Sequence, residues 1–506
     1  MIKIIDCGSQ LTQNIARRIR DLGVYAEIIP YHESPKEIFT KDLEGLIISG
    51  GQFSVYDKDA PLYAKEILAT TIPVLGICYG LQSIAYLLGG TVIPSDKREY
   101  GKTSIKLEKE NSLFKKIYDN NFNVWMSHGD IVQETPVDFT IIARSGNGYI
   151  AAMHKDNIYA VQFHPEVDHT EHGKQILDNF IEICHAQRTW TSEKQYDLIN
   201  QDLKEKIQGK TGIGAVSGGV DSTIAALLAN KITNTNYHPI FVDNGLLRLN
   251  ETQEVQERYT KLGLNVSYIN ASHRFLEKLG SITDSDEKRK IIGHEFINVF
   301  EEEARKFKDA SYLIQGTLYP DVIESIPVYG SSSKIKRHHN VGGLPEKLNL
   351  KIIEPFRYLF KDEVRKIAEH MFHLPRDIVW RHPFPGPGLA VRIIGEVTPE
   401  KLELLRKADT IFMQELKNKN LYYDMNQAFA VLLDSYSVGV MGDEGTYQGI
   451  IALRAVTTSD FMTADWYDFK KKDIMDIANR IINEVKGINR VVYDVSQKPP
   501  STIEWE

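Results

Sequence analysis

Six consecutive residues near the middle of the chain have the composition of a phosphate-binding loop. They follow residues 212–216, an apolar run typical of a strand, and precede residues 223–229, which have a helical pattern. Two glycines let backbone N–H groups approach an anion closely, and the free amides of the helix's first turn add partial positive charge. Asp221 is suited to help hold a metal ion that accompanies the phosphates. The predicted loop consists of Ser217, Gly218, Gly219, Val220, Asp221 and Ser222.

Two other interpretations of this region are possible. Gly209-Lys210-Thr211 looks like the end of a P-loop, but Lys204 stands where that motif requires a glycine. A glycine pair before a helix also occurs in tight turns that bind nothing. The stretch Ser217–Ser222 resembles the pyrophosphate loop of the ATP pyrophosphatase family, whose members cleave ATP between its α and β phosphates and adenylylate a substrate. The resemblance implies that ATP binds here.

A second motif places a cysteine between a strand and a helix. Residues 73–77 form an apolar strand pattern that runs into Gly76-Ile77-Cys78-Tyr79-Gly80, a G-x-C-x-G elbow, and then into the helical pattern of residues 81–88. A nucleophile on such a sharp turn needs small neighbours, and a helix N-terminus favours the thiolate form of a cysteine. The alternative is a buried structural cysteine. We adopt that alternative for Cys7 and Cys184, which lack an elbow.

A base for this nucleophile is predicted at the end of another strand-like segment, in the sequence Tyr159 to Glu166. His164 and Glu166 are two residues apart, which in extended chain puts both side chains on one face. The carboxylate can then orient the imidazole as it takes the thiol proton. His-Pro-Glu alone is more often an ordinary loop, so the prediction depends on the elbow as well.

The first 189 residues resemble the class I glutamine amidotransferases, which use a Cys-His-Glu triad. The resemblance implies that Cys78 is the nucleophile, His164 the general base and Glu166 its orienter. It also implies that the backbone amides of Gly51 and Tyr79 form the oxyanion hole, and that Gln82 and residues 127–130 hold glutamine. One position departs from the family, because Gln52 replaces a proline and removes its restriction on φ.

Strand and helix patterns alternate through the first two thirds of the chain. Residues 2–6, 43–48 and 73–77 are strand-like and are separated by helical patterns, which indicates a parallel sheet covered by helices. A boundary is expected near residue 190. Beyond the phosphate loop, residues 237–242 form the next strand, and the backbone of Val242 is the candidate contact for adenine.

Two further features are expected near the ATP site. Asp321 and Glu324 lie within one helical turn if their segment is helical, so they suit a metal or a basic lid, although both could simply be solvated. Residues 329–344 are basic and are bounded by serines and glycines, so this segment is predicted to close over ATP. A nucleic-acid patch is the competing interpretation, but one short basic cluster in an acidic chain is weak support for it.

Length, charge and cysteine count limit the possible classes of protein. A chain of 506 residues is too long for one core and suggests about two to four domains. The net charge of −8 argues against a nucleic-acid scaffold. Three cysteines without a signal peptide predict reduced thiols in the cytoplasm, and no apolar run approaches transmembrane length. Residues 381–389, rich in proline and glycine, predict a rigid domain junction.

Taken together, the glutaminase motifs, the pyrophosphate loop, the His-His-Asn-Val-Gly-Gly lid, the Pro-Gly-Pro-Gly junction and the Ile-Glu-Trp-Glu terminus resemble the glutamine-hydrolysing GMP synthetase family over essentially the whole chain. The resemblance implies that Mg-ATP adenylylates the 2-oxygen of xanthosine monophosphate (XMP) and that ammonia from glutamine displaces AMP to give GMP. It implies that Mg²⁺ accompanies ATP and that Asp221 helps to hold it. By family match the XMP-binding residues are Arg289, Gln427, Lys498, Ile503 and Glu504, and the lid residues are Lys336, Asp321 and Glu324.

The expected fold is α/β, with two doubly wound parallel-sheet domains followed by a smaller α+β dimerisation domain. The expected boundaries are 1–189 for the amidotransferase domain, 190–381 for the ATP pyrophosphatase domain, and 382–506 for the dimerisation and nucleotide-substrate domain. The resemblance implies a homodimer through the last region, with no nucleic-acid or membrane partner. Two rival functions share the ATP chemistry, namely a tRNA-modifying ATP pyrophosphatase and NAD synthetase. A non-enzymatic regulator would need a broken triad or loop.

Overall fold

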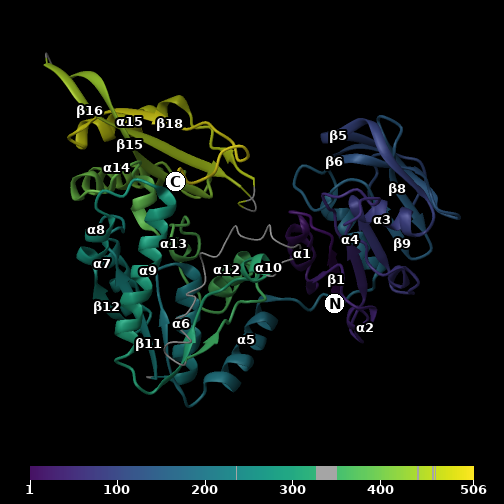
Figure 1. Cartoon of the computed structure of the whole chain (residues 1–506), viewed down its shortest axis with the longest axis horizontal. Helices are drawn as coiled ribbons and strands as arrows, with labels where there is room; N and C mark the ends of the chain where they lie inside the picture. The colour runs from purple at the N-terminus through teal and green to yellow at the C-terminus, as the bar shows by residue number, and fades with distance from the viewer. Residues whose placement is uncertain (235, 326–349, 442–443, 459–460, 462) are drawn as a thin grey trace. The chain divides into compact units, whose positions relative to one another are not determined.

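The computed structural model describes residues 1–234, 236–325, 350–441, 444–458, 461 and 463–506, and it divides into two compact units (Figure 1). The first unit is built on residues 1–195 and the second on residues 196–323 and 350–506. No described helix has the length and apolar character needed to cross a bilayer.

Residues 1–195, all of them described, form a nine-stranded sheet in the order β2-β1-β3-β4-β9-β8-β7-β5-β6. The first five strands in this order run parallel, as the sequence predicts, and the other four are joined antiparallel. The strands are β1 (Ile2–Asp6), β2 (Ala26–Pro30), β3 (Gly45–Ile48), β4 (Val74–Ile77), β5 (Thr91–Leu107), β6 (Asn121–Glu134), β7 (Thr140–Ser145), β8 (Ile150–Lys155) and β9 (Ile158–Val161). The helices are α1 (Thr12–Asp21), α2 (Pro35–Ile38), α3 (Tyr79–Leu87) and α4 (Gly173–Ile183), with short 3-10 turns η1 (Lys65–Leu68) and η2 (Ser112–Phe114).

Burial follows the two kinds of strand in this sheet. Every residue of β1, β3, β4 and β9 is buried, because helices and loops cover both faces of the parallel part. In β6 buried and more exposed residues alternate, which is typical of an antiparallel sheet with one wet face. The expected α/β fold is therefore confirmed, and a long antiparallel extension is added to it.

The second unit begins with a five-stranded sheet whose described strands are all parallel, in the order β12-β11-β10-β13-β14. The strands are β10 (Thr211–Ala215), β11 (Tyr237–Asp243), β12 (Ser267–Asn270), β13 (Ala310–Ile314) and β14 (Lys351–Ile353). The helices are α5 (Ser192–Ile207), α6 (Val220–Thr233), α7 (Glu251–Lys261), α8 (Ser272–Leu279), α9 (Ser285–Ala304), α10 (Tyr319–Ser325), α12 (Lys361–His370) and α13 (Arg376–Val379). Because β10 is central, its carboxyl end is the topological switch point at which such sheets bind ligands.

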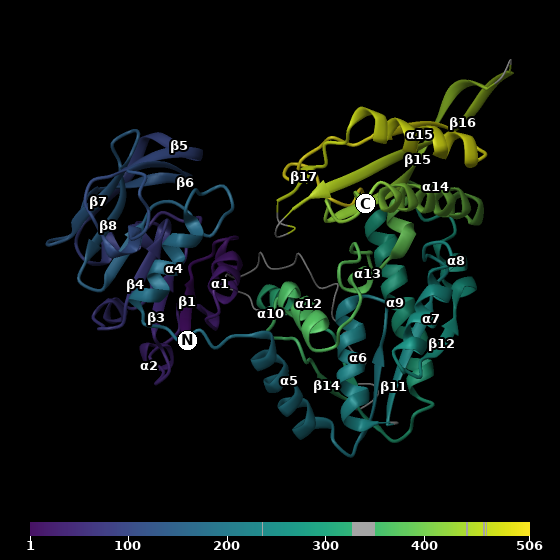
Figure 2. The same cartoon turned by 180° about the vertical axis from the view of Figure 1, so that it is seen from behind.

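The chain then builds a second sheet from β15 (Gln427–Met441), β16 (Glu444–Thr457), β17 (Asp465–Trp466) and β18 (Ile488–Tyr493). The 3-10 turn η3 (Gly388–Arg392) precedes α14 (Pro399–Asn418), and α15 (Lys471–Glu484) packs against α14 and β18. Figures 1 and 2 both show the hairpin of β15 and β16 running on beyond α14 and α15.

The two faces of this C-terminal sheet are buried against different partners. Ala428, Ala430 and Leu453 belong to a large core that also contains Ile213 of the parallel sheet. Phe429, Val431, Ala452 and Val456 face the other way and pack with Ile503 of the terminal segment. One hydrophobic core therefore runs across residue 381, and the division of this unit into domains 190–381 and 382–506 stays a prediction.

Candidate active sites

The predicted elbow is present between β4 and α3. Cys78 has φ 56° and ψ −106°, a strained conformation outside the helix, and Tyr79 begins α3. A side chain at Gly80 would put its Cβ 2.4 Å from the carbonyl oxygen of Ile48, and one at Gly76 would put its Cβ 2.7 Å from that of Gly80. Both glycines of the G-x-C-x-G motif are therefore required by close backbone contacts.

The structure brings the predicted base to this elbow. His164 Nδ1 lies 2.7 Å from Glu166 Oε1, and both side chains are buried. Burial disfavours the imidazolium, but the negative charges of Glu166 and Cys78 outweigh it and raise the pKa of His164 well above its ordinary value. The pair lies in the turn after β9 and not in the strand, because β9 ends at Val161. The hydroxyl of Thr170 holds this turn by donating to the carbonyl of His164 at 2.6 Å.

The residues predicted to form the oxyanion hole and the glutamine site surround Cys78. A Cβ built on Gly51 would lie 2.6 Å from the carbonyl oxygen of Cys7 and 3.3 Å from Tyr79 Cγ, so this loop passes directly over the start of α3. Gln82 is buried and donates to the carbonyl of Asp130 at 2.9 Å. The carbonyl of Ser127 lies 3.7 Å from the Cys78 sulfur. The segment 127–130 and the elbow therefore form one site.

The phosphate loop joins β10 to α6 as the sequence predicts. Gly219 is the N-cap of α6, and Gly218 has φ 79°, a conformation that favours glycine. Oγ of Ser222 accepts the N–H of Ser217 at 3.2 Å and thereby closes the loop. The N–H of Gly218 donates to the hydroxyl of buried Tyr259 at 2.9 Å, so this amide points to α7 and not to a ligand. The sequence pattern gave no signal for Tyr259.

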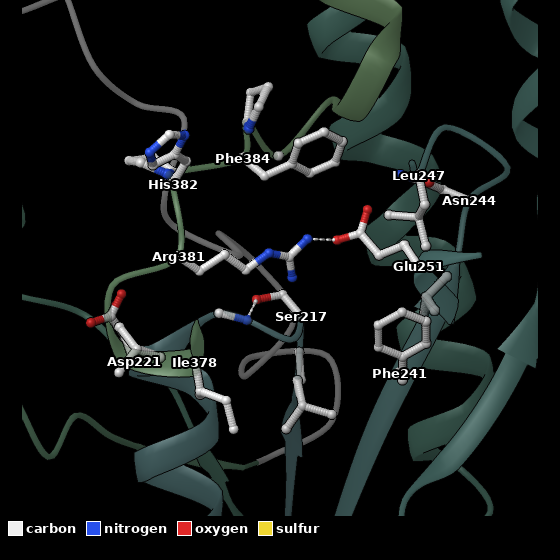
Figure 3. A pocket seen from close by; sticks show the side chains of 18 of the residues that line it. Ser217, Asp221, Phe241, Asn244, Leu247, Glu251, Ile378, Arg381, His382 and Phe384 are labelled. Carbon is white, nitrogen blue, oxygen red and sulfur yellow. Dashed lines mark hydrogen bonds and ion pairs between the residues drawn. The ribbon is translucent and has the colours of Figure 1, made fainter. Parts of the chain in front are cut away.

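A cavity of about 490 Å³ opens at this loop (Figure 3). Ser217, Gly219, Val220, Asp221 and Val242 line it, whereas Gly218 and Ser222 are not among the lining residues. The residues of the Pro-Gly-rich junction that also line it are His382, Pro383, Phe384, Pro385 and Gly386. The junction predicted from residues 381–389 is therefore also a wall of the cavity.

Charged residues that sequence analysis missed cross this cavity. Figure 3 shows Arg381 reaching to Glu251 of α7, with which it forms a hydrogen-bonded ion pair. Burial disfavours the charged form of both side chains, but the attraction between the two charges is stronger than this effect. It lowers the pKa of Glu251 and raises the pKa of Arg381. Lys361 Nζ lies 3.5 Å from Asp221 Oδ2. These residues come from three separate segments, and no short motif links them.

Asp221 has the property expected of a metal-binding carboxylate. Among the described residues, its Oδ1 is buried without a hydrogen-bond partner. No cluster of three or more acidic, histidine or cysteine side chains suited to a metal occurs in the described part of the chain. One free carboxylate oxygen fits Mg²⁺, which usually takes one or two carboxylates together with phosphate oxygens and water.

The predicted lid can be followed only in part. Lys336 and all of residues 329–344 lie outside the described residues, as does the side chain of Glu324. Asp321 accepts the backbone N–H of Leu318 at 3.0 Å at the start of α10. This contact gives Asp321 a local structural role, and its role as a lid partner stays a prediction.

The terminal segment is docked on the C-terminal sheet. Glu504 accepts hydrogen bonds from Gln427 at 2.6 Å and from Arg392 at 2.8 and 3.1 Å. Arg289 donates to the backbone carbonyl of Glu506, and Lys498 Nζ donates to the carbonyl of Phe461 at 2.7 Å. Ile503 is buried in the sheet core described above. The expectation that the terminus is no loose tail is confirmed.

Arg392 is the central residue of this terminal cluster and was not predicted. Its side chain is fully buried, and it packs over the ring of Phe429 with Cζ 4.1 Å from the ring centroid. Its Nη1 is buried without a partner among the described residues. Phe384 of the cavity wall lies on Arg392 as well, at 5.2 Å. Arg392 therefore links the cavity wall to the terminal segment.

The folds and sites define an amidotransferase unit joined to a nucleotide-binding unit, and comparison with known proteins agrees. The family model for glutamine amidotransferase class-I matches residues 3–184, and that for the GMP synthase C terminal domain matches residues 414–505. Curated proteins described as glutamine-hydrolysing GMP synthases are similar over the whole chain. Those of Fusobacterium nucleatum, Aquifex aeolicus and Saccharomyces cerevisiae are 50%, 52% and 49% identical, covering 100% of this chain and 99%, 99% and 98% of the relatives. The chain belongs to the glutamine-hydrolysing GMP synthase family.

Proposed function

We propose that this chain makes GMP through two chemically separate sites, one that releases ammonia from glutamine and one that activates XMP with ATP. The family to which it belongs consists of ligases that use glutamine as amide donor. The observation that carries the proposal is the strained elbow at Cys78 beside the buried pair of His164 and Glu166. Neither a tRNA-modifying enzyme nor NAD synthetase is favoured once the family match spans the chain.

In the first site, the Cys78 sulfur attacks the side-chain amide carbon of glutamine. His164 takes the thiol proton and passes a proton to the nitrogen, which leaves as ammonia while a thioester forms on Cys78. Water then hydrolyses the thioester and releases glutamate. Glu166 holds the imidazole in orientation through its 2.7 Å contact. The amides of Gly51 and Tyr79 are proposed to stabilise the oxyanion, since Tyr79 follows Cys78 in the elbow and Gly51 lies against Tyr79.

In the second site, the 2-oxygen of XMP attacks the α-phosphorus of ATP and pyrophosphate leaves. Ammonia then adds to C2, and AMP departs with the former XMP oxygen. Ser217, Gly219 and Val220, in the loop that leads into α6, are proposed to hold the phosphates, and Val242 to contact adenine, because they line the cavity. Asp221 would hold Mg²⁺, which would supply positive charge against the phosphates. Lys336, Asp321 and Glu324 are assigned to the lid by family match.

The XMP site is proposed at the terminal cluster. The residues proposed to bind XMP are Arg289, Gln427, Lys498, Ile503 and Glu504. In the ATP site, Gly218 and Ser222 are proposed to hold the shape of the phosphate loop through their contacts with Tyr259 and Ser217. The support is the convergence of Gln427 and Arg392 on Glu504, which leaves a rigid carboxylate able to accept hydrogen bonds from a nucleotide. The domain boundaries 1–189, 190–381 and 382–506 are retained as a proposal with these roles.

We also propose a homodimer formed through the C-terminal region. On the hairpin of β15 and β16, Tyr436, Val438, Val440 and Tyr447 are 59%, 72%, 77% and 70% exposed. An exposed apolar strand pair of this kind favours a protein partner. Sedimentation at micromolar concentration is expected to show two chains, and a fully active monomer would contradict the proposal.

The three free, buried thiols of Cys7, Cys78 and Cys184 support a cytoplasmic location.

The function is tested by separating the two nitrogen sources. Cys78→Ala is expected to abolish GMP formation with glutamine and to leave formation with an ammonium salt intact, because only the first route needs the thiol. The measurement is product mass spectrometry with XMP, ATP and Mg²⁺. Cys184→Ala, which removes a buried cysteine outside the site, is the matched control. Glutamine use by Cys78→Ala near the wild-type rate would overturn the assignment.

A further inference from the structure

The first unit contains a second buried carboxylate and imidazole pair outside the catalytic triad. Glu99 of β5 and His128 of β6 face each other as direct cross-strand partners, with His128 Nε2 3.0 Å from Glu99 Oε2. Each side chain is only 2% exposed. A buried pair of this kind costs desolvation and often stabilises a fold no better than apolar residues of the same size. Its presence therefore calls for an explanation other than stability.

Donors converge on Glu99 and keep it ionised. Its Oε1 accepts hydrogen bonds from Ser145 at 2.7 Å and from Asn147 at 2.8 Å. Burial acts to raise the pKa of Glu99, but the hydrogen bonds from His128, Ser145 and Asn147 outweigh burial and lower it. On the far side of the ring, His128 Nδ1 donates to the carbonyl of Asp130 at 2.9 Å. The imidazole is thus held between two acceptors.

The pair lies where the strand register is irregular. Pro94 pairs with Asp130 and Glu99 pairs with His128, so four residues of β5 stand opposite the single residue Gly129 of β6. Such a bulge leaves the register underdetermined unless a specific contact fixes it. The contact between Glu99 and His128 is the first pair after the bulge, and it sets the register of the segment 127–130 against β5.

That segment contacts the glutamine site at two points. The carbonyl of Ser127 lies 3.7 Å from the Cys78 sulfur. The carbonyl of Asp130, which receives the His128 hydrogen bond, also receives the side-chain amide of Gln82 at 2.9 Å. The carboxylate of Asp130 accepts the hydroxyl of Tyr56 at 3.0 Å, which ties down the loop that follows Gly51. A shift of the segment would therefore disturb its contacts with Cys78, with Gln82 and with the loop that follows Gly51.

We propose that Glu99 and His128 are positioning residues that fix the segment 127–130 against Gln82 and Cys78 and so set the shape of the glutamine site. The proposal rests on the proposed glutaminase function. The pair does not touch the sulfur and takes no part in proton transfer. Its loss is expected to weaken recognition of glutamine while leaving the nucleophile and the whole second unit intact.

The test compares two reagents that alkylate Cys78. A glutamine-shaped diazoketone, 6-diazo-5-oxonorleucine, must occupy the glutamine site before it reacts, whereas iodoacetamide needs only an accessible thiol. For Glu99→Gln and His128→Gln, the second-order rate of labelling by the diazoketone is expected to fall about tenfold, while labelling by iodoacetamide stays at the wild-type rate. The KM for glutamine is expected to rise by a similar factor, and ammonia-dependent GMP formation should not change.

Controls separate this proposal from a folding defect and from failure of the glutaminase assignment. Glu108→Gln alters an exposed carboxylate just beyond β5 that pairs with Arg144, and it should leave both labelling rates unchanged. Cys78→Ala should lose labelling by both reagents. If it is still labelled and still uses glutamine, the glutaminase function itself fails. If instead Glu99→Gln slows both reagents equally, or slows neither, the glutaminase function stands and the positioning role is overturned.

Discussion

The glutaminase site and the proposed nucleotide site at the terminal segment differ in how much of their geometry short stretches of the chain impose. The first depends on one elbow of five residues and on His164 and Glu166, two residues apart. In the second, Glu504 meets Gln427 and Arg392, which are 77 and 112 residues away. A strand, turn and helix impose the elbow locally, and the pairing of β4 with β9 brings His164 and Glu166 to it. The second geometry exists only when the whole second unit is folded, so changes there should affect binding and stability together.

The largest effect is expected from removing residues 498–506. Lys288 and Arg392, both fully buried, would lose their carboxylate partners Glu506 and Glu504, and an unpaired buried charge costs about 3–5 kcal/mol. XMP-dependent synthesis should vanish and the midpoint of thermal unfolding of the second unit should fall, as measured by product assay and calorimetry. Iodoacetamide labelling of Cys78 in the first unit should persist.

A milder change keeps this prediction testable if the truncated chain does not fold. Glu504→Gln preserves the shape but removes the charge that Arg392 binds, so the KM for XMP should rise about tenfold or more with the KM for ATP unchanged. Glu444→Gln, at the exposed start of β16, is the matched control. Unaltered XMP dependence in both the truncation and Glu504→Gln would remove Lys498 and Glu504 from the site.

A loss of about a hundredfold is expected for Asp221→Ala with either nitrogen source. Its buried Oδ1 is free to bind a metal, and both routes pass through the same ATP site. The measurement is the rate of AMP formation with glutamine and with ammonium. Asp202→Ala, which alters an exposed carboxylate of α5, serves as the control. Full ammonia-driven activity in Asp221→Ala would refute the role.

These predictions show which parts of the molecule the sequence could reveal. The elbow and the phosphate loop were predictable because their glycines and reactive side chains stand within six residues and obey local backbone rules. Tyr259 and Arg392 were not predictable, because their roles arise from α7 meeting the loop and from η3 meeting the terminus. Periodicity also gave the parallel strands, whereas the antiparallel extension of the first sheet depends on long-range pairing of β5 and β6.

A smaller effect is expected for Tyr259→Phe. Without the hydroxyl, the buried N–H of Gly218 loses its acceptor, and the loop loses a contact that fixes its shape. The KM for ATP should rise about fivefold, which corresponds to about 1 kcal/mol. Tyr358→Phe, at an exposed position in the same unit, should have no effect. An unchanged KM for ATP in Tyr259→Phe would show that the loop holds its shape without α7.

A separate prediction concerns acid stability and not activity. Burial, with help from Arg248, lowers the pKa of His382 from 6.5 to about 4. Between these values the unfolded chain binds a proton that the folded chain does not, so stability falls as pH drops from 6.5 to 4. His382 should contribute up to about 3 kcal/mol of this loss. Urea unfolding of His382→Gln should show a correspondingly weaker pH dependence over that window, and an identical slope would contradict the lowered pKa.

The central claim is that nitrogen passes from glutamine to GMP and that the 2-oxygen of XMP leaves with AMP. A double isotope label tests this claim most directly. The chain is incubated with [amide-¹⁵N]glutamine, [2-¹⁸O]XMP, ATP and Mg²⁺, and the products are analysed by mass spectrometry. The account predicts GMP that is heavier by one mass unit, AMP that is heavier by two, and unlabelled pyrophosphate, because the 2-oxygen of XMP leaves with AMP. Unlabelled AMP, or ADP and phosphate in place of AMP and pyrophosphate, would contradict adenylylation of XMP at this loop.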